Sequence, residues 1–160
     1  MELKYLLNKH EDHYLLQVAF ETQADQQTLW QTIATSQGIT QWFPELSYDQ
    51  DYKTLIFSMP ELDFREEMAI LAYQPESKVS FDWAGARVDF AFSSADQGGR
   101  LVFAETMPFD FPNPENDMAG WLVHLTRLQA YFNGQDQPTI DAIKGPVEAA
   151  LRARLAELDT

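Results

Sequence analysis

A single stripe of large apolar side chains runs through residues 114–133, and no other feature constrains the fold as much. Its members recur at helical spacing; they are Met118, Trp121, Leu125, Leu128 and Phe132. Asn113 before Pro114 is a typical helix start and Asn133-Gly134 a typical stop, which predicts a helix of about twenty residues, ~30 Å long. A stripe this long needs a wide apolar surface to cover it.

The chain before this helix has the period-2 pattern of strands with one covered face. The first predicted strand covers residues 13–22, and a short helix with Leu29, Trp30 and Ile33 on one side follows it. Further strands are predicted at residues 45–49, 52–59, 62–73, 77–84, 86–94 and 99–108. Their connections are short, so the pairing should be antiparallel, with hairpins at Ala84-Gly85 and at residues 96–99. Bulky side chains share one face: Leu55, Phe57, Met59, Val79, Phe81, Trp83, Val88, Phe90, Phe92, Leu101 and Phe103.

This order of elements is that of an α+β layer arrangement. We predict a curved antiparallel sheet of about six or seven strands that wraps around the long C-terminal helix and leaves a cleft between them. The main domain should span residues 1–134. Residues 135–160 should form an appendage, with an amphipathic helix after Gly145-Pro146 that contains Val147, Ala150, Leu151, Leu155 and Leu158. Packing on its own domain is preferred for this helix, and packing on a second copy is the alternative.

Composition narrows the classes of partner and compartment. Lys and Arg total 11 against 25 Asp and Glu, a net charge of -14, and such a surface repels phosphate backbones and anionic headgroups. Binding to nucleic acid or to a membrane is therefore not expected. The sequence has no cysteine, which excludes disulfides and thiolate zinc sites, and its N-terminus reaches charged residues too early for a secretory signal. A cytoplasmic location is predicted.

Two stretches carry a more specific signature. Residues 20–43 contain Phe20-Glu21-Thr22, Leu29-Trp30, Ile39 and Gln41-Trp42-Phe43, followed by Pro44, and residues 120–134 read GWLVHLTRLQAYFNG. Both resemble the family of homologues of the activator of heat-shock-protein-90 ATPase, over roughly residues 13–134. The resemblance implies the helix-grip fold of the START-like (SRPBCC) superfamily. Its members include lipid carriers, polyketide cyclases, plant-hormone receptors and chaperone activators, so several activities stay open.

Two polar residues occupy positions at which the pattern predicts apolar side chains. Glu105 has the strand parity of Leu101 and Phe103, so its carboxylate should point into the apolar face. His124 lies one turn after Trp121, at the edge of the helical stripe. We hypothesise that Glu105 and His124 form a polar spot in the cleft that orients a ligand or moves a proton. The alternative is a satisfied core histidine and a carboxylate that escapes at a strand end.

Aromatic residues are the predicted walls of the cleft, with a solid core as the alternative for each. Together with the two polar residues, the predicted ligand-binding set is Trp30, Trp42, Phe57, Phe81, Trp83, Phe90, Phe103, Glu105, Trp121, His124, Leu125 and Leu128. No catalytic group, metal site or cofactor is predicted. The segment His10-Glu11-Asp12-His13 has metal-like residue types without a metal-binding helical spacing, and a solvated turn is preferred for it.

Three functions stay open at this point. The preferred one is non-catalytic binding of a small hydrophobic or amphipathic molecule between sheet and helix, with apolar burial as the source of affinity. The second, implied by the resemblance, is a chaperone-regulating interaction with a partner protein through the acidic surface or the terminal helix. The third is a cyclase-like or hydrolase-like enzyme that uses His124 and Glu105. The oligomeric state, monomer or homodimer, is left open.

Overall fold

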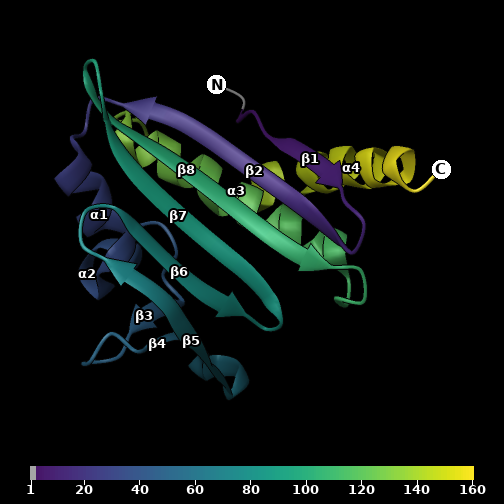
Figure 1. The fold of residues 1–160 in the computed structure, drawn as a ribbon, viewed down its shortest axis with the longest axis horizontal. Helices are drawn as coiled ribbons and strands as arrows, with labels where there is room; N and C mark the ends of the chain where they lie inside the picture. The colour runs from purple at the N-terminus through teal and green to yellow at the C-terminus, as the bar shows by residue number, and fades with distance from the viewer. Residues whose placement is uncertain (1–2) are drawn as a thin grey trace.

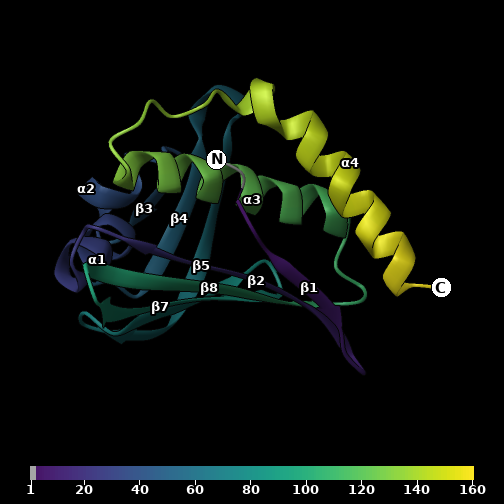
Figure 2. The same cartoon turned by 90° about the horizontal axis from the view of Figure 1, so that it is seen from above.

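The computed structural model describes residues 3–160, and it consists of one curved antiparallel sheet crossed by a long helix (Figures 1 and 2). The strands pair in the order β1-β2-β8-β7-β6-β5-β4-β3. They are β1 (Leu6–Lys9), β2 (His13–Thr22), β3 (Leu46–Tyr48), β4 (Thr54–Met59), β5 (Phe64–Gln74), β6 (Lys78–Trp83), β7 (Ala86–Ala95) and β8 (Gly98–Pro108). The helices are α1 (Gln26–Ala34), α2 (Ser36–Ile39), the 3-10 turn η1 (Pro60–Leu62), α3 (Pro114–Phe132) and α4 (Ile140–Leu158). The predicted α+β class and the sheet curved around a long helix are confirmed.

The predicted strands lie within two residues of the observed ones at every end. The sheet has eight strands rather than six or seven, because β1 adds to the outer edge of β2 with Leu7 opposite Leu16. Sequence patterning missed β1 since Leu7 is its single buried residue, and one apolar position shows no alternation. The turn η1 occupies the point at which the strand at residues 62–73 was expected to begin.

The predicted stripe of α3 lies on the concave face of the sheet. Met118, Trp121, Leu125 and Leu128 are buried, and Phe132 is half-buried. The helix ends as predicted, with Gly134 in the left-handed region at φ 68°. Its start differs from the expectation, because the side chain of Asn113 makes no capping hydrogen bond and its backbone is itself left-handed at φ 50°. Asparagine tolerates that conformation better than most residues.

Both predicted hairpins are present, but their glycines act differently. Ala84 and Gly85 have φ values of 53° and 102°, so the first turn uses the positive φ that was expected. Gly98 and Gly99 belong to β8 and have no such φ. They are required instead by close packing, since a Cβ on Gly98 would lie 2.2 Å from the carbonyl oxygen of Thr22.

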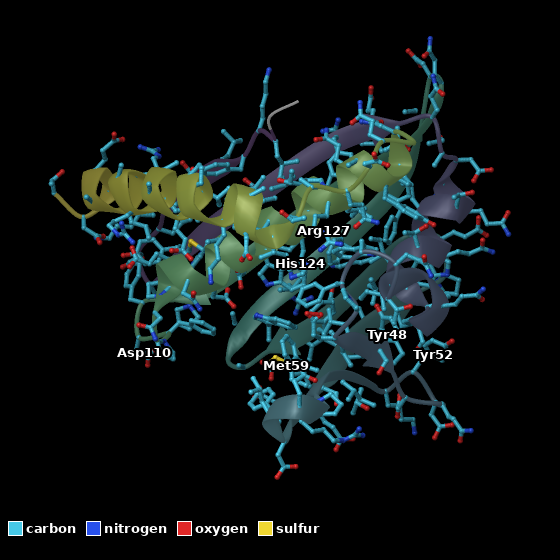
Figure 3. All side chains as sticks on the ribbon, turned by 180° about the vertical axis from the view of Figure 1, so that it is seen from behind. Tyr48, Tyr52, Met59, Asp110, His124 and Arg127 are labelled. Carbon is cyan, nitrogen blue, oxygen red and sulfur yellow. The ribbon has the colours of Figure 1, made fainter. Side chains whose placement is uncertain are left out.

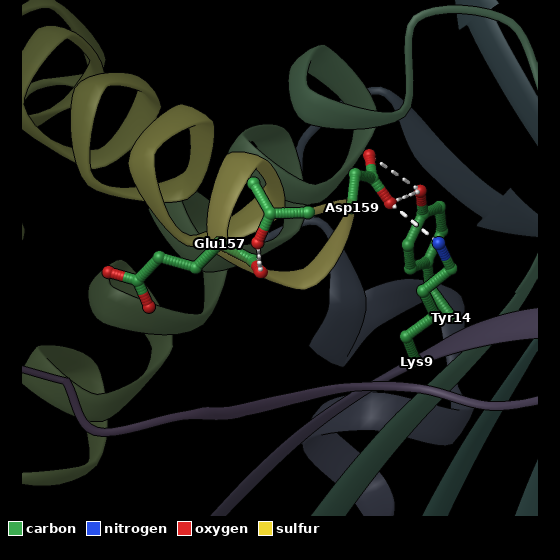
Figure 4. A network of polar contacts seen from close by, with 5 residues as sticks. Lys9, Tyr14, Glu157 and Asp159 are labelled. Carbon is green, nitrogen blue, oxygen red and sulfur yellow. Dashed lines mark hydrogen bonds and ion pairs between the residues drawn. The ribbon is translucent and has the colours of Figure 1, made fainter.

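Helix α4 begins at Ile140, earlier than predicted, and contains Gly145-Pro146 inside it. It packs on α3 and β1 of its own chain, as preferred from the sequence, and it buries Leu151 and Leu155 in the common core. Its C-terminal end is fixed by Asp159, which accepts hydrogen bonds from the Tyr14 hydroxyl at 2.9 Å and from Lys9 Nζ at 3.1 Å (Figure 4). Helix α4 therefore lies along part of the side of α3 that faces away from the sheet (Figure 2).

Candidate ligand-binding site between the sheet and the long helix

Aromatic side chains fill the space between the sheet and α3. The Trp121 ring lies at their centre, with ring centroids 4.8 Å from Trp83, 5.2 Å from Phe103 and 5.5 Å from Phe43. Of the twelve predicted cleft-lining residues, eleven are buried and Phe57 is half-buried. Trp30 lies apart from Trp121, against Tyr73 and Phe92. The predicted set thus surrounds α3 as packed side chains.

A row of aromatic rings leads from this core to the surface. Trp121 touches Trp83, whose ring centroid is 5.9 Å from that of Phe57, and Phe57 in turn lies 5.8 Å from Phe64. Exposure increases along the row: Trp121 is 1% exposed, Trp83 9% and Phe64 41%. Phe64 begins β5 beside η1, so the row ends at the outer tip of the β4–β5 hairpin.

The carboxyl group of Glu105 lies inside this apolar layer, as its strand parity predicted. Glu105 is opposite Leu16 on β2 and Val88 on β7, and the residue is 0% exposed. Neither of its carboxyl oxygens has a hydrogen-bond partner among residues 3–160. A buried acceptor without a donor costs free energy, so this position calls for a physical account.

The neighbour of this carboxyl is Asp117, in the first turn of α3. The indole Nε1 of Trp83 donates a hydrogen bond to Oδ1 of Asp117 at 2.7 Å, while Oδ2 of Asp117 is buried with no partner from residues 3–160. The indole donor and the helix N-terminus both stabilise negative charge on Asp117. The N–H of the buried Trp121 indole also has no partner in the part of the chain that the structure describes. Before a shared proton is placed, four polar atoms between α3 and the sheet have no hydrogen-bond partner among residues 3–160: Oε1 and Oε2 of Glu105, Oδ2 of Asp117 and Nε1 of Trp121.

Burial, and next the Asp117 carboxyl, raises the pKa of Glu105 well above its ordinary range. The two carboxyls hydrogen-bond to each other only when a proton lies between them. Glu105 is the group that takes this proton, because Asp117 already has the indole donor and the helix N-terminus. The site is therefore a buried acidic pair in an aromatic shell.

The proton held by Glu105 should make the free energy of unfolding depend on pH. Because the folded-state pKa of Glu105 is raised, the folded protein holds a proton that the unfolded chain releases, and stability falls as the pH rises above about 4.5. Glu105→Gln replaces the protonated acid with a neutral amide of the same shape, so we expect it to be more stable than the natural protein at pH 8 and nearly equal to it at pH 4. Urea unfolding at both pH values measures this, with the exposed Glu66→Gln as control. Equal stabilities of Glu105→Gln and the natural protein at pH 8 would contradict a retained proton.

His124 does not join Glu105, contrary to the hypothesised polar spot. It lies two helical turns beyond Asp117, about 10 Å along the axis, in the middle of α3 (Figure 3). Its ring stacks on Phe43 with centroids 3.7 Å apart, and its Nδ1 is 3.2 Å from the carbonyl oxygen of Trp42. A carbonyl only accepts, so Nδ1 carries the hydrogen. Within the described chain, His124 thus links α3 to the segment before β3, as the satisfied histidine of the alternative.

Burial lowers the pKa of His124 from 6.5 to about 4, against the opposing effect of the Trp42 carbonyl. Between pH 6.5 and pH 4, His124 is protonated in the unfolded chain and neutral in the folded protein. The free energy of unfolding therefore falls as the pH drops through this range. We expect this loss to reach about 3 kcal/mol and to be absent in His124→Phe, which keeps the stack on Phe43. Urea unfolding across this pH range measures it, with the exposed His10→Gln as control. An NMR titration of His124 with a midpoint near 6.5 would contradict the assignment.

Sequence patterning missed Asp117 as a site residue, although a signal was present. Asp117 precedes Trp121 by four residues, which places it on the inward face of the helix beside Met118. The indole N–H of Trp83 was also missed as a donor, because Trp83 was treated only as a wall. An acidic residue at i−4 from a buried tryptophan is the pattern that points to it.

Other hollows lie outside this layer. One of about 250 Å³ lies between α3 and α4 and is lined mostly by apolar groups, among them Leu122, Val147 and Ala150. A more polar one, at the far end of α3, is bordered by Glu21, Asp96 and Asn133. Within residues 3–160, no helix is long and apolar enough to cross a bilayer, and no three or more His, Cys, Asp or Glu side chains gather as metal ligands would.

Comparison with known proteins supports the fold. No protein-family model matches the sequence, and no curated protein gives a significant match. A conserved protein of unknown function from Enterococcus faecalis, EF2215, superposes with a TM-score of 0.86 at 25% identity, covering 98% of this chain and 93% of that one. The two chains therefore share one architecture, an antiparallel sheet curved around a long C-terminal helix.

Two further solved structures extend the comparison. CalU16 from Micromonospora echinospora has a TM-score of 0.71 at 16% identity and covers 96% of this chain and 98% of its own. The Aha1 dimer from Colwellia psychrerythraea has a TM-score of 0.59 at 14% identity, over 74% of this chain and 95% of that one. At these identities the likeness describes the fold alone.

Proposed function

We propose that this chain is a non-catalytic binding domain for a small amphipathic molecule, held between the sheet and α3. The observation that carries the proposal is the set of polar atoms of Glu105, Asp117 and Trp121 that have no partner in the described part of the chain, inside an aromatic core. A guest with a polar end would supply the missing hydrogen bonds, and its apolar body would be buried against the rings.

The row of rings supplies the route for such a guest. Trp83 is 9% exposed, its indole N–H bonds to Asp117, and its ring packs against neighbouring rings such as that of Trp121. Displacement of this indole would open the way to the carboxyl pair. Phe57 and Phe64 continue the apolar wall outward. The apolar body would then lie along the β4–β5 side of the sheet, with the polar end at Glu105.

A ligand screen by thermal shift, followed by NMR, tests the proposal. We expect amphipathic hits that raise the melting temperature and that move the indole N–H resonances of Trp83 and Trp121, because both indoles border the polar end of the site. Phe57→Ala should weaken these hits, while Tyr131→Ala, an exposed aromatic of α3, should not. Hits that move only Leu122, Val147 and Ala150 would place binding in the hollow beside α4 and contradict the proposal.

A second candidate is a chaperone-regulating interaction within the family of activators of heat-shock-protein-90 ATPase. The likeness to the Aha1 dimer favours it, together with the exposed Leu62 and Phe64 at the tip of the β4–β5 hairpin. Light scattering of the purified chain tests the dimer that this candidate includes. A dimer that Leu62→Ser converts to a monomer supports it, and a monomer at all concentrations counts against it.

The enzyme alternative that uses His124 with Glu105 has no support of this kind. Proton transfer between two side chains requires hydrogen-bond reach, or one water between them. His124 lies about 10 Å along α3 from the residue that faces Glu105. We therefore do not propose a reaction for this pair.

A further inference from the structure

The unsatisfied atoms of the acidic pair define which polar group fits them. When the proton shared by the two carboxyls is removed, Oε1 and Oε2 of Glu105 and Oδ2 of Asp117 are three buried acceptors without a donor among residues 3–160, while Oδ1 of Asp117 has the Trp83 indole. A primary ammonium group has three N–H donors and a positive charge. It therefore matches the deprotonated pair both in the number of hydrogen bonds and in charge, whereas a hydroxyl has one donor and a carboxylate brings no donor and adds negative charge.

The walls around the pair also suit a cation. The Trp121 ring packs between two others, with its centroid 4.8 Å from that of Trp83 and 5.2 Å from that of Phe103. Tryptophan and phenylalanine faces attract ammonium groups, and the attraction is stronger where water is excluded. The net charge of -14 adds a long-range attraction for cationic molecules.

We propose that the ligand of this site is a primary amine with an apolar tail, whose ammonium group donates to Glu105 and Asp117. This inference rests on the proposed function, because it names the polar end of the molecule that the site between sheet and helix would hold. The tail lies along Trp83 and Phe57 toward Phe64, and the Trp83 indole, after moving aside to admit the ligand, donates to Oδ1 of Asp117 again.

Binding of the amine is linked to a proton. The ammonium takes the place of the proton held between the two carboxyls, so binding releases a proton whenever Glu105 is protonated. The strand neighbours of Glu105, Leu16 and Val88, do not titrate, and α3 contributes Asp117. His124, the next titratable group along the inward face, is neutral at pH 7 and two turns away. Affinity for the amine should therefore fall as the pH is lowered, with more protons released per ligand.

The test compares three eight-carbon probes by titration calorimetry: n-octylamine, 1-octanol and octanoate. We expect octylamine to bind at least tenfold more tightly than octanol, and octanoate to give no measurable binding. Glu105→Gln should lower the octylamine affinity at least tenfold and leave octanol unchanged, and Glu66→Gln should match the natural protein. Titrations at pH 6.5 and pH 8, each in two buffers with different ionisation enthalpies, give the number of protons released.

The outcomes separate this inference from the proposed function. If octanol binds as tightly as octylamine and moves the Trp83 indole resonance, the proposal of a primary amine is wrong, and the proposed binding site between the sheet and α3 is supported. If no probe moves that resonance, both are wrong. Near-UV circular dichroism confirms that Glu105→Gln is folded, and Asp117→Asn serves as the second variant if it is not. Octylamine binding that survives both substitutions overturns the assignment of the carboxyls.

Discussion

Trp121→Ala is expected to lower the free energy of unfolding by about 3–5 kcal/mol. The indole is 1% exposed and touches rings from three directions, with Trp83, Phe103 and Phe43 within 5.5 Å between centroids. Alanine would leave a cavity that these stiff aromatic neighbours refill poorly, because each is itself held by the sheet or by the segment before β3. Urea unfolding at pH 7 measures the change.

The matched control lies on the same helix. Tyr131 is 40% exposed, so Tyr131→Ala should cost less than about 1 kcal/mol. A loss for Trp121→Ala no greater than for Tyr131→Ala would mean that α3 does not rest on the sheet through this residue. The whole placement of the candidate site would then be wrong.

Gly98→Ala is expected to cost about 3 kcal/mol, a large effect for one methyl group. The added Cβ would lie 2.2 Å from the Thr22 carbonyl oxygen and 2.7 Å from the Gln23 carbonyl carbon. Both obstacles are backbone atoms, so no side-chain rotation relieves the clash. Strand β8 would have to shift away from the end of β2, with which it forms its longest ladder.

Gly120→Ala is the matched control, because it adds the same methyl group and is expected to change the free energy of unfolding in the opposite direction. A Cβ on Gly120 meets no atom within 4 Å, and the residue lies inside α3. Alanine should therefore raise the free energy of unfolding by about 0.5–1 kcal/mol, through higher helix propensity. Equal effects of the two substitutions would show that backbone contact at Gly98 is not the cause.

Most of the fold could be predicted because hydrophobic periodicity reports directly which face of an element is covered. Strand β2 and the stripe of α3 are examples, since each has apolar residues at every expected position. The predicted start of α4, after Gly145-Pro146, was wrong for a physical reason. Pro146 lacks an N–H, but it and Ala142 are exposed beside the hollow between α3 and α4, so water can satisfy the carbonyl that the proline leaves free.

The candidate site was predicted only in part, because periodicity fixes faces and not positions along them. Parity correctly placed Glu105 in the apolar layer. Asp117 and His124 both lie on buried parts of α3, and which of them meets Glu105 depends on how far the helix is shifted along the sheet. That shift is set by the packing of the whole core. The ligand-binding role of the cleft residues, and the division of the chain at Gly134, stay predictions.

The pairing of β2 with β8 has a consequence for the order of assembly. The other neighbouring strands follow one another in the chain, whereas residue 13 must find residue 108. On a ribosome the β1–β2 hairpin emerges long before its permanent partner, and its open edge stays available to other strands in the meantime. Closing this one distant ladder joins the β1–β2 hairpin to the last strand of the meander, and such non-local contacts are slow to form. We therefore expect the β3–β7 meander to acquire protection from hydrogen exchange first, and β2 to be protected only once β8 has been made.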